Sequence, residues 1–222
     1  ILLSTGEFVN MIGDDDGDQR EIVEIAHYMK QHSIDSLNCY RCQYRWPGLK
    51  AVYFSNAGTL KIKKTKGHMQ EIDVKTELKN ILKQGASSTY GKLPCVYNGI
   101  VKRSLLDKVY EKTGSFFPGP SPDMANAIAL SLLAEKHMYL DYPISWAGKS
   151  ANSAGGMGAT HKHSLEIENV PWLSKQTVNE WDKRIPKYWT SVSVWADSAL
   201  KALYHMGRSD MIKEYFSFEA VY

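Results

Sequence analysis

The sequence contains little cysteine. Only three of its 222 residues are cysteines, namely Cys39, Cys42 and Cys95. An odd number argues against the disulfide framework of a secreted domain and for a reducing compartment. Cys39 and Cys42 have CxxC spacing, but neither a second pair nor a His-x-x-His sequence nearby completes a zinc site. We therefore expect three ordinary thiols, buried or half-buried.

The sequence also lacks a long hydrophobic run and a recognisable signal peptide. Its best apolar stretch, residues 124–134, has about 11 residues and includes polar ones, whereas a membrane helix needs about 20. No membrane span is therefore expected. The predicted location is the cytoplasm, with peripheral association at the inner face of the membrane left open.

Charge is unevenly distributed along the chain. Residues 1–37 carry eight acidic and two basic side chains, whereas residues 41–83 carry ten basic and three acidic ones. An acidic pocket beside a basic stretch suits an anionic ligand, and a solvated basic surface is the alternative interpretation. The basic residues are scattered, so nucleic acid is not an expected partner.

Hydrophobic spacing predicts strands that alternate with helices. Strands are expected over residues 7–12, 36–44, 52–54, 60–64, 94–100 and 139–147. Helices are expected from residue 18 or 19 to about residue 32, and over residues 74–83, 102–113, 124–136, 176–182, 191–205 and 210–216. This alternation predicts an α/β layer fold.

The most informative feature is the run Asp14-Asp15-Asp16, which follows the hydrophobic residues 8–13. Three adjacent carboxylates repel one another unless a cation sits among them. Mg²⁺ and Mn²⁺ suit such oxygen clusters and bind through one or two carboxylates plus substrate phosphates. The run therefore predicts a metal site that holds a phosphorylated substrate. A solvated turn or a helix N-terminus is the structural alternative.

Other metal and phosphate motifs fit this run less well. An EF-hand loop starting at Asp14 would need Gly at its sixth position and Glu at its twelfth, where Gln19 and Ile25 stand. The P-loop pattern GxxxxGK[ST] is missing from the sequence. A phosphohydrolase with an Asp nucleophile remains an alternative, although Asp18 occupies its usual Thr position and no second acidic pair follows.

Two further groups of residues carry candidate chemistry. Asp123 follows Pro122 at the start of an apolar helix, where it either caps the helix or accepts a proton from an attacking hydroxyl. His161 and His163 flank Lys162 in a segment rich in Gly, Ser and Ala. Such loops often carry function; an imidazole there is able to bind a metal, and Lys162 is able to face phosphate.

The order of these motifs resembles family 2 glycosyltransferases with the GT-A fold. Residues 4–17 resemble the segment that leads into the family's DxD motif. Residues 117–130 resemble the acceptor-side segment with the catalytic base, and residues 148–163 resemble the flexible loop that brings a histidine to the metal. The resemblance covers residues 1–165. It implies a GT-A-like catalytic region there, a mixed α/β sheet flanked by helices, and a helical C-terminal extension over residues 166–222.

The resemblance implies a metal-dependent glycosyltransferase of the hexosyltransferase type. Such an enzyme moves a sugar, with inversion, from a nucleotide-diphosphate-sugar such as a UDP-sugar to a hydroxyl of a saccharide or lipid-linked saccharide acceptor, here in bacterial surface polysaccharide synthesis. The implied roles are metal binding of Mn²⁺ or Mg²⁺ by Asp14, Asp16, His161 and His163, donor contact by Asp14, Asp15 and Lys162, and general base catalysis by Asp123.

Two features depart from the family pattern. Position 122 is Pro, whereas the family more usually has an acidic pair at its base. A nucleotide-binding half of about 80–100 residues, the size of a small domain, is expected before the DxD motif and does not precede it in this sequence. Besides the phosphohydrolase, a non-catalytic interaction module is therefore a further alternative.

Overall fold

The computed structural model describes residues 1–49, 58–153, 165–171 and 173–222. Within these ranges the main sheet consists of β1 (Phe8–Val9), β2 (Gly17–Asp18), β3 (Ser36–Arg45), β4 (Thr59–Lys61), β5 (Met69–Glu71), β6 (Gly99–Lys102) and β7 (His137–Lys149). The α-helices are α1 (Ile22–Gln31), α2 (Val74–Lys83), α3 (Arg103–Thr113), α4 (Pro122–Ser131), α6 (Lys175–Asn179), α7 (Ser191–His205) and α8 (Ser209–Tyr215). A separate strand pair joins β8 (Leu165–Glu166) to β9 (Tyr188–Trp189), and short 3-10 turns cover Ile167–Asn169 and Glu219–Val221.

The sheet is mixed, with strand order β1-β6-β3-β7-β2. Its long central strands β3 and β7 are parallel, and the other pairs are antiparallel. Strand β4 pairs with the end of β3, and β5 pairs with β7. Because β1 and β2 lie at opposite ends of this order, the link between them must cross the sheet. That link, residues 10–16, contains the aspartate run.

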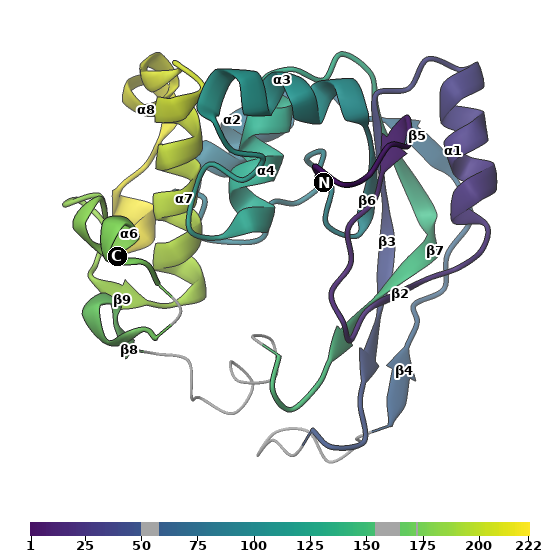
Figure 1. Ribbon diagram of the computed structural model, residues 1–222, viewed down its shortest axis with the longest axis horizontal. Helices are drawn as coiled ribbons and strands as arrows, with labels where there is room; N and C mark the ends of the chain where they lie inside the picture. The colour runs from purple at the N-terminus through teal and green to yellow at the C-terminus, as the bar shows by residue number, and fades with distance from the viewer. Residues whose placement is uncertain (50–57, 154–164, 172) are drawn as a thin grey trace.

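Helices cover both faces of the sheet (Figure 1). On one face, α1 packs through Met29 against a small core that includes Leu37 of β3. On the other face lie α2, α3 and α4, and α7 and α8 form a further layer beyond them (Figure 1). Helix α4 is buried from Met124 to Ser131 because it lies between these layers. The C-terminal helices share one core with α2 and α4, and the predicted boundary at residue 165 stays a prediction.

Helices with strong local signals match their predicted bounds. The Asp73 carboxylate accepts hydrogen bonds from the backbone N–H groups of Lys75 and Thr76, which fixes the start of α2. Thr190 and Ser193 form a capping box at the start of α7. Residues 74–83 and 191–205 are therefore helical as predicted.

Elements that depend on distant pairing differ from the prediction. Gly17 and Asp18 pair with Trp146 and Ser145 as β2, so α1 begins only at Ile22. The strand expected over residues 94–100 is confined to Gly99–Lys102, because residues 94–98 form a loop beside α4. Helix α4 starts at Pro122 and ends at Ser131, earlier than expected at both ends. The strand expected over residues 52–54 lies outside the described residues.

The expectations about thiols and apolar runs agree with the fold. All three cysteines are buried and unbridged. The most apolar segment forms the buried helix α4. Among the described helices, none combines the length and the apolar character that crossing a membrane requires.

His137 supplies a pH-sensitive element of stability. Its Nε2 lies 2.8 Å from the Lys92 carbonyl oxygen, and its Nδ1 lies 2.8 Å from the Ser36 hydroxyl and 3.1 Å from the Ser36 carbonyl oxygen. Burial lowers the pKa of His137 from 6.5 to about 4. The unfolded chain therefore binds this proton at a higher pH than the folded chain, and folding stability is lost as the pH falls from 6.5 towards 4.

We expect His137 to account for about 2 kcal/mol of stability lost between pH 7 and pH 5. Urea unfolding at the two pH values measures this loss. His137→Gln should remove that part of the pH dependence, whereas His27→Gln, at an exposed site on α1, should not. Equal pH dependence in the two variants would show that His137 is not the titrating group.

Candidate functional site

Asp16 is the most strongly held carboxylate of the aspartate run. Its Oδ2 accepts hydrogen bonds from the Gly13 N–H at 2.8 Å, the Tyr97 hydroxyl at 2.6 Å and the Asn98 side-chain amide at 3.4 Å. Its Oδ1 accepts from the Gly148 N–H at 2.7 Å. Asp16 thus ties the link between β1 and β2 to the loop before β6 and to the end of β7.

The other two aspartates have contrasting environments. Asp15 is 9% exposed, and its Oδ2 accepts from the Ser150 N–H at 2.9 Å. Its backbone carbonyl accepts from the Trp46 indole at 2.9 Å. A Cβ on Gly148 would lie 1.7 Å from that carbonyl oxygen, so only glycine allows this approach. Asp14 is exposed, and no hydrogen bond holds its carboxylate within the described chain.

The segment around Tyr97 positions the aspartates. Met11 and Tyr97 form an isolated parallel bridge, and the Asn98 N–H donates to the Met11 carbonyl at 2.8 Å. Asn98 has φ 55°, a left-handed conformation that asparagine tolerates better than most residues. From there its amide nitrogen reaches Asp16 while its Oδ1 accepts from the Ser145 hydroxyl at 3.3 Å.

Asp123 lies in the first turn of α4, two residues after the N-cap Ser121. Its Oδ1 accepts from the Ser121 hydroxyl and from the Met124 N–H at 2.8 Å. No hydrogen bond to its Oδ2 occurs among the described residues. The start of a helix favours a negative charge at this position.

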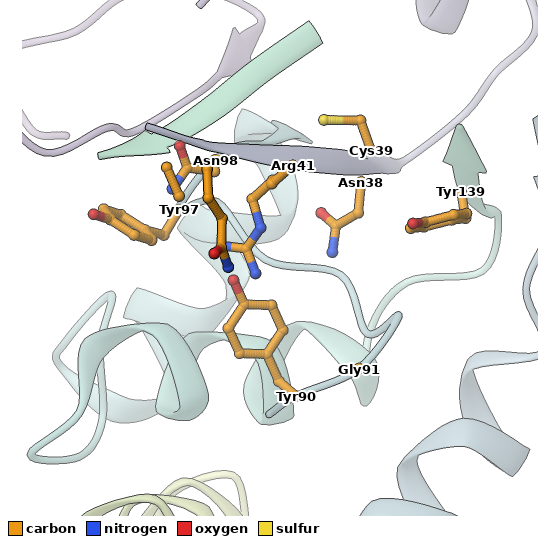
Figure 2. A pocket seen from close by; sticks show the side chains of 10 residues that line it. Asn38, Cys39, Arg41, Tyr90, Gly91, Tyr97, Asn98 and Tyr139 are labelled. Atoms are coloured by element: carbon orange, nitrogen blue, oxygen red, sulfur yellow. The ribbon is translucent and has the colours of Figure 1, made fainter. Parts of the chain in front are cut away.

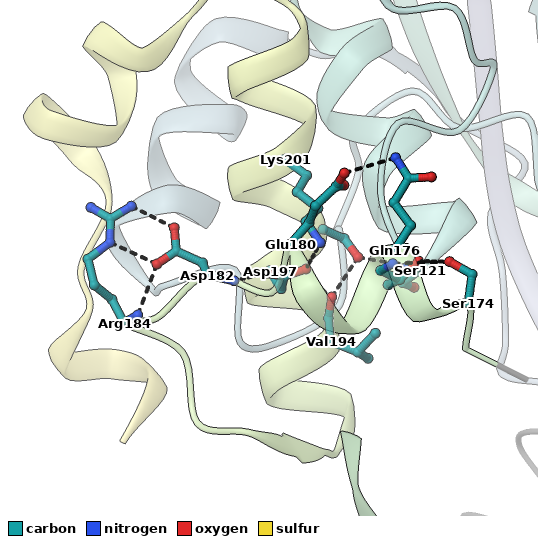
Figure 3. Close-up of polar contacts among 11 residues, drawn as sticks. Ser121, Ser174, Gln176, Glu180, Asp182, Arg184, Val194, Asp197 and Lys201 are labelled. Carbon is teal, nitrogen blue, oxygen red and sulfur yellow. Dashed lines mark hydrogen bonds and ion pairs between the residues drawn. The ribbon is translucent and has the colours of Figure 1, made fainter. Parts of the chain in front are cut away.

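Helix α7 fixes the position of this turn. The Ser121 N–H donates to the Ser198 hydroxyl at 2.8 Å, and that hydroxyl donates to the Val194 carbonyl at 2.6 Å. On the same helix, the buried Asp197 accepts from the Asp182 N–H at 2.8 Å and pairs with Lys201 at 3.0 Å (Figure 3). Asp123 therefore lies at the start of a helix that contacts with α7 hold in place.

Tyr97 lies near both the aspartate run and Asp123. Burial raises the pKa of the Tyr97 phenol well above its usual range, and its hydrogen bond to Asp16 raises it further. The charges of Asp15 and Asp123 act in the same direction. Burial and then the charge of Asp123 raise the pKa of Cys95 to about 12, and the Cys95 thiol donates to the Asp123 carbonyl at 3.6 Å. The two acidic groups therefore act on the same small region.

A cavity of about 310 Å³ adjoins this region. It is lined by Arg41 and Gln43 from β3, Tyr90, Tyr97 and Asn98 from the segment between α2 and β6, and Tyr139 from β7. Figure 2 shows Tyr97 and Tyr139 on opposite sides of the pocket, with Arg41 between them and Tyr90 facing Arg41. The volume lies at the lower end of the range for small-molecule sites, and the wall that Tyr97 and Asn98 form is the one that binds Asp16.

Asp18 adds a further acidic group. Its Oδ1 is buried and lacks a hydrogen-bond partner in the part of the chain that the structure describes. Burial, followed by the charge of Asp16, raises the pKa of Asp18 to about 6. Carboxylates are therefore concentrated at the end of the link that crosses the sheet and in the strand β2 that follows it.

The carboxylates fit a cation shared with a substrate better than a protein-only metal cage. No ion pair among the described residues joins Asp14, Asp15, Asp16 or Asp18 to a lysine or arginine. The described residues also contain no group of three or more His, Cys, Asp or Glu side chains arranged to hold a metal. Mg²⁺ and Mn²⁺ often take only one or two carboxylates and complete their shell with phosphates and water. Asp14, and the oxygens of Asp15 and Asp16 with remaining capacity, suit that mode.

The sequence predicted part of this arrangement. Of the predicted site residues, His161, Lys162 and His163 lie outside the described residues. Tyr97, Asn98 and Arg41 were missed. The Asn98-Gly99 pair is a turn signal that would have argued against a continuous strand there, whereas Arg41 on a strand carries no signal of its own.

Comparisons with known proteins identify the fold. No family model matches the sequence, and no curated protein matches it either. The crystal structure of S. aureus TarS 1-349 in complex with UDP-GlcNAc matches with a TM-score of 0.50 and 16% identity, over 96% of this chain and 49% of that chain. A second structure of S. aureus TarS 1-349 gives a TM-score of 0.42 and 15% identity, over 94% of this chain and 50% of that one.

The fold is similar to that of TarS, a glycosyltransferase. The mixed α/β fold predicted from the sequence, with a mixed sheet flanked by helices, is thereby confirmed. Identity at this level establishes the fold alone. The chain spans about half the length of the TarS chain that it matches.

Proposed function

We propose that the protein is a glycosyltransferase that moves a sugar from a nucleotide-diphosphate-sugar to an acceptor hydroxyl. The observation that carries this proposal is the position of Tyr97, which donates a hydrogen bond to Asp16 and lines the cavity. The likeness in fold to TarS, a glycosyltransferase whose structure contains UDP-GlcNAc, supports it. The same likeness favours this proposal over the phosphohydrolase alternative.

Each acidic residue has a proposed role. Asp14, Asp16, His161 and His163 would hold Mn²⁺ or Mg²⁺, and Asp14, Asp15 and Lys162 would contact the donor. When bound, the ion supplies Lewis-acid stabilisation of the departing diphosphate. Asp123 accepts the proton of the attacking acceptor hydroxyl as general base, through the Oδ2 that its helix does not use. A carboxylate in this role corresponds to an inverting transfer.

The proposal also names a donor and an acceptor. A UDP-sugar is the proposed donor, since the TarS complex contains UDP-GlcNAc. The proposed acceptor is a saccharide or lipid-linked saccharide in bacterial surface polysaccharide synthesis. The cytoplasmic location expected from the sequence stays a prediction.

Thermal unfolding with UDP and Mn²⁺ tests the proposal. UDP and Mn²⁺ together, at about 100 times the Kd, should stabilise the folded protein by about 2.7 kcal/mol, and either alone by much less. Asp14→Asn should remove this combined effect without changing the stability of the unliganded protein, because Asp14 is exposed. Glu24→Gln, at an exposed site on α1, is the matched control.

Two outcomes would contradict the proposal. The first is the lack of any response to UDP, Mn²⁺ or both, which favours an interaction module. The second is release of phosphate from a generic phosphomonoester that Asp14→Asn abolishes, which favours the phosphohydrolase.

A further inference from the structure

Arg41 is a half-buried cation without a carboxylate partner in the described part of the chain. None of the ion pairs found there includes it. Its guanidinium lies over the Tyr90 ring, 5.3 Å from the ring centroid. An arginine cannot discharge itself by losing a proton, so its charge must be stabilised by its surroundings or by a ligand.

Three protein groups that interact with this charge are neutral at pH 7. The side chains whose charges would influence Arg41 are Tyr90, Cys95 and Cys39. Burial raises the pKa of all three above its usual value, so they stay protonated. A desolvated charge without a partner is costly. The cost is explained if an anion from a ligand completes the site.

The charged groups near the two ends of the cavity differ in sign, and this difference indicates how a ligand is oriented. At the Tyr97 end stand Asp16 and, further off, Asp15 and Asp123. At the other end, the Lys92 ammonium lies 4.7 Å from the centroid of the Tyr139 ring. A sugar oriented with its reacting carbon towards the acidic end therefore extends past Arg41, which lies between the two ends, and one of its substituents faces the guanidinium.

We infer that Arg41 receives a carboxylate or phosphate carried by the sugar that occupies this cavity. The inference rests on the proposed function for the orientation of the sugar, and it names an anionic sugar as the substrate class. A planar guanidinium matches either oxyanion with two parallel hydrogen bonds. Gln43 and Asn98, which also line the cavity, are suited to the neutral hydroxyls.

The test compares ligands that differ only in the anionic group. Ligand-observed NMR titrations measure the Kd of glucuronate and glucose 6-phosphate against glucose, and of UDP-glucuronate against UDP-glucose. The anionic member of a pair should bind at least about tenfold more tightly, which corresponds to about 1.4 kcal/mol. A gain confined to the nucleotide-linked pair assigns the anion to the donor, and a gain confined to the free sugars assigns it to the acceptor.

Arg41→Met should abolish this preference, whereas Arg208→Met, which removes an exposed charge paired with Asp210, should retain it. Arg41→Lys keeps the charge but loses the two parallel N–H donors of the guanidinium, and it should retain only part of the preference. Arg41→Met should unfold at the same temperature as the wild type or higher, because it removes a desolvated charge that has no partner. Loss of the preference is then not due to misfolding.

Equal binding of charged and neutral ligands by the wild type would overturn the inference. So would a preference that survives in Arg41→Met, or an equal loss of glucose and glucuronate binding in that variant. If no variant binds UDP while the free-sugar preference persists and depends on Arg41, the inference holds and the proposed function fails.

Discussion

Asp123→Asn is expected to lower the rate of sugar transfer by about 10²–10⁴-fold, the usual contribution of a general base. Asparagine keeps a side-chain oxygen for the hydrogen bonds from Ser121 and Met124, so the first turn of α4 should stay in place. The amide cannot accept a proton from the acceptor hydroxyl. The loss should therefore appear in kcat, with the Kd of the nucleotide-sugar unchanged.

Separate measurements of transfer rate and of donor binding check this prediction. Asp107→Asn, in α3, is the matched control, and it should leave both quantities unchanged. Full transfer activity in Asp123→Asn would show that Asp123 only stabilises the start of a helix. Loss of donor binding together with transfer would instead place it among the donor contacts.

Asp16→Asn should have the second large effect, on stability as well as on binding. Four donors point at the Asp16 carboxylate, and both of its oxygens accept. An asparagine amide nitrogen would face one or more of these donors, so at least one charge-assisted hydrogen bond is lost. We expect the free energy of unfolding to fall by about 1–3 kcal/mol and the combined effect of UDP and Mn²⁺ to disappear.

Urea unfolding of Asp16→Asn and Asp14→Asn separates the structural role from ligand binding. Asp14→Asn should match the wild type in stability, because Asp14 is exposed, and should lose only the ligand response. Tyr97→Phe, which removes one of the four donors, should fall between the two in stability. If Asp16→Asn were as stable as the wild type, the hydrogen bonds around this carboxylate would not be holding the loop.

Local signals explain why some of the fold was predictable from the sequence. Asp73 and Thr190 each cap a helix by hydrogen bonds to residues close by in the sequence. The starts of α2 and α7 can therefore be predicted from local sequence. The aspartate run was recognisable because three adjacent carboxylates need an explanation. Asp123 was recognisable from its place before an apolar helix.

The rest depends on contacts between residues far apart in the sequence. Asp18 pairs with Ser145, more than a hundred residues away, and nothing near Asp18 announces this strand. The sequence around Tyr97 predicted a buried strand. The role of Tyr97 comes from its hydrogen bond to Asp16, which lies on a distant segment of the chain. Arg41 reads as an ordinary strand residue until the cavity beside it is seen. Residues of this kind are recognised only once the fold brings their partners together.

The most direct test of the central claim is UDP release from a panel of UDP-sugars with Mn²⁺, in the wild type and in Asp123→Asn. The proposal predicts release that requires Mn²⁺, increases when a saccharide acceptor is added and falls by at least about 10²-fold in Asp123→Asn. Release that is equal in the two proteins, or no release from any UDP-sugar with any acceptor, would contradict it.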